Sequence, residues 1–241
     1  MKRRAFLQTT GASLLAPACM PVLSAAAPAA PAAPAEGRGD QRLSLEALQQ
    51  WEALGYGMFI HFGMSTFVNN ELPSGKDAPE LYAPDQLDVD LLTSKHVAGH
   101  CLWPTKHSDY SVVNSVNTTD VMAKFVEACR KHGILPGFYY CSWDNHNRFG
   151  SKTPSDQGGD LPAYTTSLYQ DFQAAQITEL MTTYGPFAEV WVDIPGVLGR
   201  GYRTFLYQHI AALQPNTVIM MNSGISSGET YDINYAWPSD L

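Results

Sequence analysis

Five short apolar runs, each ending in polar or glycine residues, recur along the chain at 55–63, 91–96, 135–143, 189–196 and 217–224. In the fourth run, "EVWVDIPG", aliphatic residues alternate with polar or aromatic ones, which is the period of a strand. The run is also too short and too β-branched for a helix. We predict that each of the five runs forms a buried strand.

Amphipathic patterns typical of helices lie between most of these runs. Residues 119–133 offer Thr119 or Asp120 as an N-cap and Gly133 as a stop, with apolar positions spaced as on one helix face. Residues 167–185 and 202–216 repeat the pattern. In 167–185 the positions expected to face inward are Leu168, Phe172, Ala175, Ile177, Leu180 and Met181.

Strands that alternate with helices at this spacing imply βαβ units and a parallel sheet. A (β/α)8 barrel fits this rhythm best, and a doubly wound open sheet is the rival. No G-x-G-x-x-G or P-loop sequence follows a strand, which removes the commonest reason to prefer the open sheet. A complete barrel needs ~250 residues and eight strands. About five units are visible here, so the predicted class is α/β, an incomplete (β/α)8 TIM-like barrel.

Residues 1–36 have the composition of an export signal and a spacer. "RRAFLQ" follows Lys2 and resembles the twin-arginine signal, a modest apolar stretch comes next, and "LSAAA" offers a small-residue cleavage site. An ordinary signal peptide with paired arginines is the alternative, and either one implies a periplasmic or extracellular protein. The Ala/Pro-rich stretch up to Gly37 reads as an extended linker. We therefore expect the partial catalytic barrel to occupy residues 37–241.

The charge of the expected mature chain argues against two classes of partner. Removing residues 1–36 takes three of the 15 basic and one of the 23 acidic residues, which leaves a formal charge of −10. Nucleic acid or an anionic membrane would require a basic face. Beyond the signal there is no apolar run of the length that a membrane-spanning helix needs. The sequence carries no signal for an oligomeric state.

The cysteines indicate neither a disulfide framework nor a zinc site. Cys19 falls within the signal, and Cys101, Cys129 and Cys141 remain, an odd number at wide spacing. Buried free thiols are the expectation. No cluster of residues has the spacing of metal ligands, so no metal and no organic cofactor is implied.

Polar and aromatic residues collect where the predicted strands end. His61 ends the first strand, His96 the second and Asp193 the fourth, while Tyr139 and Trp143 lie in the third. Asp193 is either a cap for the turn at Pro195-Gly196 or a catalytic carboxylate at the mouth of a barrel. Aromatic faces stack on sugar rings, while His and carboxylate groups bind hydroxyls. A carbohydrate site is therefore the natural hypothesis.

Long motifs in a fixed order make this hypothesis more specific. "GMFIHFGMSTF", Glu71, "LTSKHVAGHCLWPTKHSDYSVVNS", "DVMAKFVEACRKHGILPGFYYCSWD", "QITELMTTYGPFAEVWVDIPG" and "VIMMNSG" resemble the α-L-fucosidases of glycoside hydrolase family 29. The resemblance extends over nearly everything from Trp51 to Leu241. It implies an enzyme that removes terminal α-L-fucose from fucosylated glycans with retention of configuration.

The resemblance also implies roles for individual residues. Asp193 matches the family's nucleophile, and His61, Glu71 and His96 match ligands of the fucose hydroxyls. Tyr139 matches the tyrosine of the family's "GxYxS" strand, and we count Trp143 with the substrate-binding residues as an aromatic group at the pocket mouth. No residue is matched to the family's acid/base carboxylate, for which Glu229 and Asp232 are the nearby candidates.

The chain also departs from the family pattern. Val97, Ala98 and His100 replace the family's second His, its Asp and its Phe, so one sugar contact is lost or replaced. About fifteen residues appear deleted before Leu91, and the acid/base region would lie beyond Leu241. We therefore expect an inactive, marginally folded fragment with an exposed apolar edge and irregular chain around 76–92.

Two other functions are carried as alternatives to the hydrolase. A catalytically inactive carbohydrate-binding fragment would keep the pocket of His61, Glu71 and His96. A metal-dependent hydrolase that uses His61, His96 and Asp193 is a more distant third possibility.

Overall fold

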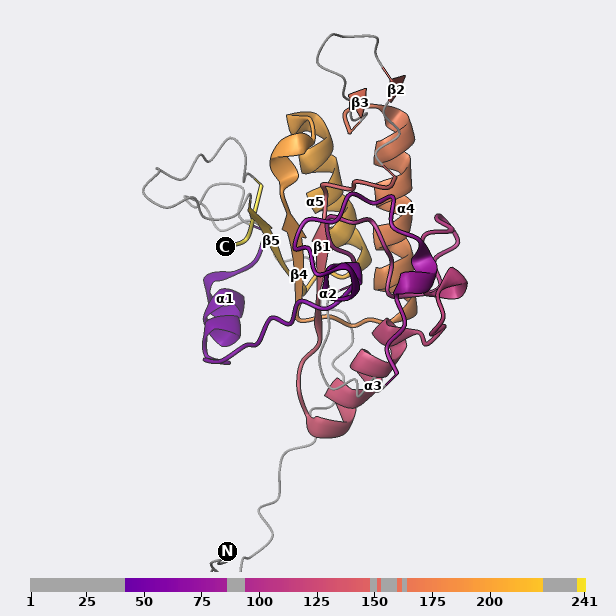
Figure 1. Ribbon diagram of the computed structural model, residues 1–241. Helices are drawn as coiled ribbons and strands as arrows, with labels where there is room; N and C mark the ends of the chain where they lie inside the picture. Colours follow the sequence, from indigo (N-terminus) through magenta and orange to yellow (C-terminus); the bar gives the residue numbers. More distant parts are fainter. Residues whose placement is uncertain (1–41, 86–93, 148–150, 153–159, 162–163, 223–237) are drawn as a thin grey trace, which may run out of the picture. The chain divides into compact units, whose positions relative to one another are not determined.

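Three parallel strands form the sheet at the centre of the computed structural model (Figure 1). They are β1 (Gly137–Cys141), β4 (Glu189–Asp193) and β5 (Val218–Asn222), and β4 lies between the other two. All three coincide with predicted runs. The structure describes residues 42–85, 94–147, 151–152, 160–161, 164–222 and 238–241. The expected export signal lies outside these residues, as do Leu91, Glu229 and Asp232.

Two further segments lie along the edges of this sheet. Lys95 forms a parallel bridge with Tyr140 of β1, and its carbonyl oxygen accepts from the Cys141 amide at 3.1 Å. At the other edge, the Asp240 amide donates to the Ile219 carbonyl oxygen of β5 at 2.8 Å. The described segments therefore follow one another across the sheet in chain order. A doubly wound sheet would instead reverse its strand order at a switch point.

Helix α3 (Val121–His132) shows how local sequence sets the element boundaries. The Asp120 side chain accepts from the Ala123 amide at 2.9 Å, which satisfies one of the unpaired donors in the first turn. Gly133 ends the helix in the left-handed conformation at φ 68°, where a Cβ atom would be unfavourable. Of the two predicted caps, Asp120 is therefore the correct one.

Helices α4 (Ser167–Thr183) and α5 (Arg200–Leu213) contact each other, and side chains from both join the main core with those of the sheet. The predicted inward face of α4 is right for Phe172, Ile177, Leu180 and Met181 but wrong for Leu168, which is 59% exposed. Gln173 and Gln176 are buried instead. They take interior positions because each makes hydrogen bonds there, Gln173 with Ser142 and Gln176 with Tyr140.

The first predicted strand, 55–63, is not a strand in the structure. Most of its residues are exposed, and none of the described residues forms a strand ladder with it. Apolar alternation yields a strand only where a neighbouring backbone supplies hydrogen bonds. The exposed apolar side chains of this part of the chain include Leu54, Tyr56, Met58 and Phe59.

The remaining elements are short. Residues 76–85, expected to be irregular, hold one 3-10 helix, and 86–92 lie outside the described residues. The short elements are α1 (Leu45–Glu52), α2 (Met64–Val68), η1 (Pro79–Leu81), η2 (Val112–Asn114), β2 (Ser151–Lys152), β3 (Asp160–Leu161) and η3 (Pro195–Val197).

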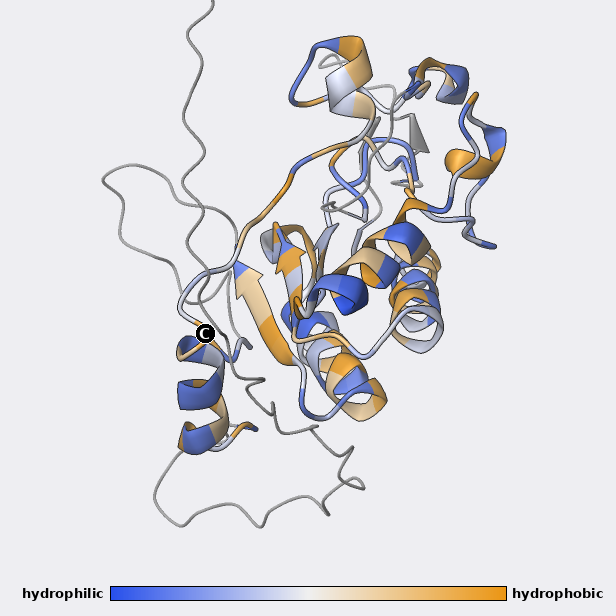
Figure 2. Cartoon of the chain, turned by 90° about the horizontal axis from the view of Figure 1, so that it is seen from below, coloured by the Kyte–Doolittle hydropathy of each residue, from blue (hydrophilic) through white to orange (hydrophobic). Residues whose placement is uncertain are grey.

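The two faces of the sheet have different partners. Tyr140, Val192 and Met221 belong to the core shared with α3, α4 and α5. Tyr139 and Trp191, one residue earlier on their strands, belong to a separate cluster. Successive side chains of a strand point to opposite faces, so this division follows from the strand period. Figure 2 shows mainly hydrophobic strands and long helices of mixed character.

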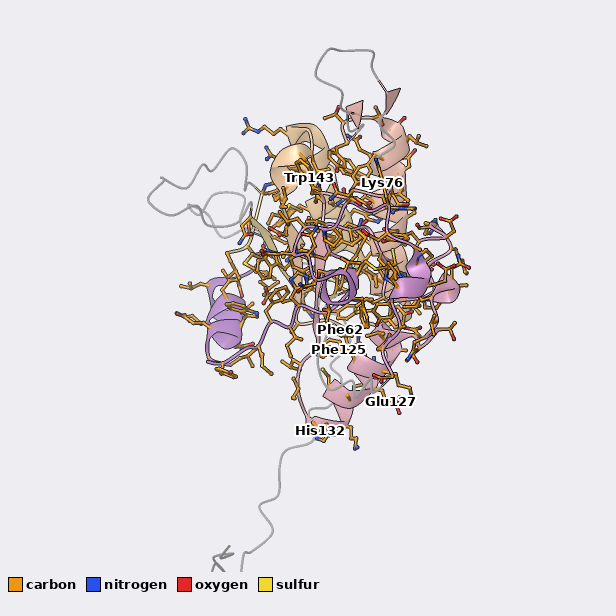
Figure 3. The ribbon with its side chains drawn as sticks, in the orientation of Figure 1. Phe62, Lys76, Phe125, Glu127, His132 and Trp143 are labelled. Atoms are coloured by element: carbon orange, nitrogen blue, oxygen red, sulfur yellow. The ribbon has the colours of Figure 1, made fainter. Side chains whose placement is uncertain are left out.

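Figure 3 gives the direction of β1. His132, before the strand, lies at the lower end of the view, and Trp143, after it, lies at the upper end. Because β4 and β5 run parallel to β1, the carboxyl ends of all three strands lie at the same end of the sheet.

The cysteines agree with the expectation from the sequence. Cys101, Cys129 and Cys141 are buried thiols that form no disulfide bond, as predicted. Within the described ranges, no helix has the length and apolar character needed to cross a membrane.

Candidate active site

Asp193 is the last residue of the central strand β4 and lies at the carboxyl end of the sheet. Its Oδ2 accepts a hydrogen bond from the Tyr139 hydroxyl at 2.6 Å, and its Oδ1 accepts from the Ile194 amide at 2.8 Å. Both carboxylate oxygens are therefore held. The turn-cap interpretation accounts for the bond to Ile194 alone, because Tyr139 comes from another strand and is 54 residues away in sequence.

Ile194 is strained in the left-handed region, at φ 50°. A β-branched residue rarely adopts this conformation, and such outliers concentrate at functional sites. The Ile194 amide also donates to the Asn222 carbonyl oxygen of β5 at 2.9 Å. The chain therefore turns sharply just after Asp193 while the carboxylate stays fixed at the strand end.

Tyr139 connects Asp193 to an aromatic wall. Burial, followed by the nearby Cys141 and Asp193, raises the pKa of Tyr139 well above its ordinary value, so its hydroxyl remains protonated and donates. The Phe59 ring lies 5.1 Å from the Tyr139 ring and 5.0 Å from that of Trp191, centroid to centroid. These three rings form an apolar surface next to the carboxylate.

Phe59 and Trp191 were not among the predicted site residues. The alternation in "EVWVD" already placed Trp191 on the same face of β4 as Asp193, so that signal was available. Phe59 gave no comparable signal, because the run 55–63 is not a strand.

His61 and His96 form a pair of neighbouring imidazoles, with ring centroids 3.8 Å apart. Burial, and then repulsion by His61, lowers the pKa of His96 to about 4. Burial also lowers the pKa of His61, although the negative charge of Glu71 opposes this shift. Both rings are therefore neutral at pH 7, and a neutral imidazole both donates and accepts hydrogen bonds.

One atom of this pair is buried without a partner. His96 Nδ1 has no hydrogen-bond partner among the described residues, whereas His61 Nε2 lies 3.2 Å from the Ser65 hydroxyl. An unsatisfied buried polar atom in a folded protein calls for an explanation. A ligand hydroxyl would supply the missing bond.

The structure brings four of the six predicted residues, His61, His96, Tyr139 and Asp193, into linked contacts. Tyr139 joins Asp193 to His96, whose ring lies 5.9 Å away, and Glu71 acts electrostatically on His61. Trp143 is 37% exposed, and its side chain donates to Asn145 and packs against the Tyr164 ring. It lies beyond the end of β1, and none of these side-chain contacts joins it to Asp193.

The residues that depart from the resembled motif take structural positions. Val97 packs in the same cluster as Tyr139 and Cys141. His100 is buried between Tyr82 and Tyr110, and its Nε2 lies 2.9 Å from the Ser115 hydroxyl. His100 therefore packs with the second core, which contains Tyr82 and Tyr110.

A search of the described residues finds no cluster of three His, Cys, Asp or Glu side chains suited to a metal ion. An open pocket of about 350 Å³ lies between the first turns of α4 and α5, with Ser167, Asp171, Tyr202 and Phe205 among its lining residues. None of the residues that line it belongs to the Asp193 cluster. The volume of this pocket therefore gives no measure of the candidate site.

Comparisons with known proteins agree on one family. The family model described as alpha-L-fucosidase matches residues 90–239. Alpha-L-fucosidase 1 of Arabidopsis thaliana is 33% identical over 198 residues, which are 73% of this chain and 36% of the relative. A putative alpha-L-fucosidase 1 of Oryza sativa subsp. japonica is 34% identical over 170 residues, which are 63% of this chain and 30% of the relative.

Solved structures give the same result. A putative alpha-L-fucosidase from Bacteroides ovatus superposes with a TM-score of 0.58 at 32% identity, covering 72% of this chain and 32% of that one. A glycoside hydrolase 29 family member from an unknown rumen bacterium gives 0.60 at 28% identity, covering 72% and 35%. The chain spans about a third of the length of each of these relatives.

Proposed function

Because this chain belongs to the alpha-L-fucosidase family, we propose that it is an exported glycoside hydrolase that removes terminal α-L-fucose from glycans with retention, using Asp193 as the nucleophile. One observation carries the proposal. The Asp193 carboxylate, anchored by Tyr139, is linked through that ring to a neutral histidine pair with an unsatisfied nitrogen.

The proposed reaction has two displacements. In the first, an Asp193 oxygen forms a bond to the anomeric carbon while the glycosidic bond breaks, and the departing oxygen takes a proton from an acid. In the second, water attacks the anomeric carbon, its proton passes to the group that acted as the acid in the first step, and the bond to the Asp193 oxygen breaks to release the carboxylate. Retaining enzymes hold the two carboxyl groups ~5–5.5 Å apart. The candidates for the second group, Glu229 and Asp232, lie outside the described residues.

The surrounding residues suit a fucose ring. His61, His96 and Glu71 are placed to exchange hydrogen bonds with ring hydroxyls, since both imidazoles are neutral and the Glu71 charge lies near His61. Phe59 and Trp191 offer an apolar wall to the less polar side of the sugar. Orientation by these groups would bring the anomeric carbon to Asp193.

The strand order supports the larger architecture. We propose that the Lys95 segment, β1, β4, β5 and the segment at Asp240 are consecutive strand positions of a (β/α)8 barrel. They follow one another in chain order, and α3, α4 and α5 separate the first four. In such a barrel the face that carries Tyr139 and Asp193 would point inward.

Covalent trapping tests the proposed nucleophile directly. Incubation with a 2-deoxy-2-fluoro-fucosyl fluoride should add one fluorofucosyl mass to the chain, and peptide mapping should place it on Asp193. Asp193→Asn, which keeps the size and shape of the side chain, should take up no label. Labelling at another residue would refute the assignment.

Carbohydrate binding without turnover remains the second candidate. It is favoured by one observation, that among the described residues Asp193 is the carboxylate hydrogen-bonded within this cluster, while the exposed Glu71 acts on it only through its charge. An aryl fucoside separates the two functions, because binding with no release of the aryl group would leave only the binding protein. Loss of turnover on adding a chelator would instead favour a metal-dependent hydrolase.

Export is tested through the paired arginines at the start of the chain. Replacing Arg3 and Arg4 by Lys should hold the protein in the cytoplasm if the twin-arginine route carries it. Continued export of that variant would favour an ordinary signal peptide.

A further inference from the structure

A fully buried ion pair begins one residue before His96, a predicted sugar ligand. Lys95 Nζ and Asp144 Oδ2 are 2.6 Å apart, and both side chains are wholly shielded from solvent. The ammonium group also lies 4.2 Å from the centre of the Tyr140 ring. Burial by itself lowers the pKa of Lys95, but the Asp144 carboxylate outweighs it and holds the pKa above its ordinary value. Lys95 therefore keeps its positive charge beside the Asp144 carboxyl group.

Such a pair does little for stability by itself. Removing two charges from water is costly, and a well-packed apolar pair of similar size is often at least as stable. We therefore consider whether the pair fixes the relative positions of the segments that it joins. The arrangement here concerns the segments that carry the predicted sugar ligands.

The pair joins the segment that carries His96 to the loop after β1. Lys95 directly precedes His96, and Asp144 Oδ1 accepts from the backbone amides of His146 at 3.0 Å and Asn147 at 2.6 Å. The Asn145 amide donates to the Val97 carbonyl oxygen at 2.8 Å, so the two segments are also joined one residue after His96.

The same loop then holds a third segment. Asn145 Nδ2 donates to the Pro73 carbonyl oxygen at 2.7 Å, and His146 Nδ1 lies 2.6 Å from the Gly75 carbonyl oxygen. A Cβ atom at Gly75 would lie 2.5 Å from the His146 amide nitrogen, so the two backbones are in close approach. Pro73 is two residues from Glu71, the second predicted sugar ligand.

We propose that the Lys95–Asp144 ion pair positions the sugar-binding residues, holding His96 directly and Glu71 through the loop 144–147. Lys95 and Asp144 are positioning residues in this account, because neither reaches the substrate. The inference rests on the proposed function, since it assigns the pair to the same sugar site.

Three variants separate positioning from stability. Lys95→Met and Asp144→Asn each leave one buried charge without its partner, and both should lower the melting temperature. The double variant replaces the pair by two neutral side chains of similar size and should recover much of the loss. As a matched control, Lys124→Met with Glu127→Gln removes an exposed pair on α3 and should change neither stability nor affinity.

Calorimetric titration with an iminosugar of fucose configuration gives the deciding readout. In the folded double variant we expect binding at least about tenfold weaker than wild type, since small displacements of orienting groups carry large penalties. We also expect the pKa of His96, followed by NMR of its imidazole, to move from its wild-type value. The proposal would be overturned if the double variant recovered the wild-type iminosugar affinity and the wild-type pKa of His96 along with its stability.

Two further outcomes remain interpretable. If the wild-type chain does not bind the iminosugar, the proposed function fails. The pKa of His96 in the double variant, compared with wild type, then decides whether the pair positions this residue. If the double variant does not fold, Asn145→Ala removes the bond to Pro73 and leaves the ion pair in place. If Asn145→Ala leaves the affinity for the iminosugar unchanged, the link to Glu71 is overturned. If the wild-type chain does not bind the iminosugar, an unchanged pKa of His61 in Asn145→Ala overturns that link.

Discussion

Two adjacent tyrosines of β1 allow a sharp test of the site. Tyr139 and Tyr140 are both buried, and each donates one short side-chain hydrogen bond, to Asp193 at 2.6 Å and to Gln176 at 2.7 Å respectively. They point to opposite faces of the sheet, so one bond lies in the candidate site and the other in the core. Replacing each by Phe removes a single hydroxyl and leaves the ring in place.

The expected magnitude follows from the charge of the acceptor. A hydrogen bond to a charged group contributes about 1.5–3 kcal/mol, and one between neutral groups about 0.5–1.5 kcal/mol. If the Tyr139 hydroxyl orients the attacking carboxylate, its full loss lowers kcat/KM roughly 10- to 150-fold, at ~1.4 kcal/mol per factor of ten. Tyr140→Phe leaves a buried Gln176 oxygen unpaired, so its cost should appear in stability.

The assay compares aryl-fucoside kinetics and thermal melts for the two variants. We expect Tyr139→Phe to lower both kcat/KM and the melting temperature, and Tyr140→Phe to lower the melting temperature while its kcat/KM stays within about threefold of wild type. Equal losses of activity would show that any buried hydroxyl of this strand matters. A Tyr139→Phe variant with wild-type kinetics would refute an orienting role for this hydroxyl.

Three further predictions concern the carboxylate and the histidines. In a full-length version that turns over an aryl fucoside, Asp193→Ala should lower kcat by several orders of magnitude while iminosugar binding survives, and retention of more than about a tenth of kcat, under ~1.4 kcal/mol of barrier, would contradict the assignment. His61→Ala and His96→Ala should each weaken iminosugar inhibition by roughly 2- to 10-fold, the equivalent of one neutral hydrogen bond, and unchanged inhibition would make both residues structural. The pKa values of His96 and His100 are lowered to about 4, so the unfolded chain binds more protons below pH 6.5. The contribution of these two imidazoles to the free energy of unfolding should be fully present above about pH 6.5. It should fall toward pH 4 by at most about 1.4 kcal/mol per pH unit for each imidazole. Denaturant melts across this pH range measure the fall, which should be shallower in His100→Gln.

Local sequence determined most of the secondary structure. The Asp120 cap and the Gly133 stop act within a few residues of the helix that they bound, and hydrophobic period distinguishes strand from helix in the same range. The position of Asp193 at a strand end followed from the same pattern. Its hydrogen bond to Tyr139 did not, because that bond joins residues 54 positions apart.

The tertiary structure decided which patterns were realised and which charges were buried. The run 55–63 has the composition of a strand, but a strand exists only where another backbone pairs with it. The sequence did not predict that Lys95 and Asp144 pair, and only the approach of two segments 49 residues apart makes their burial tolerable. Local pattern therefore predicted the elements and the candidate carboxylate. The contacts that hold that carboxylate and its neighbours in place depend on distances between segments, which a pattern along the chain does not contain.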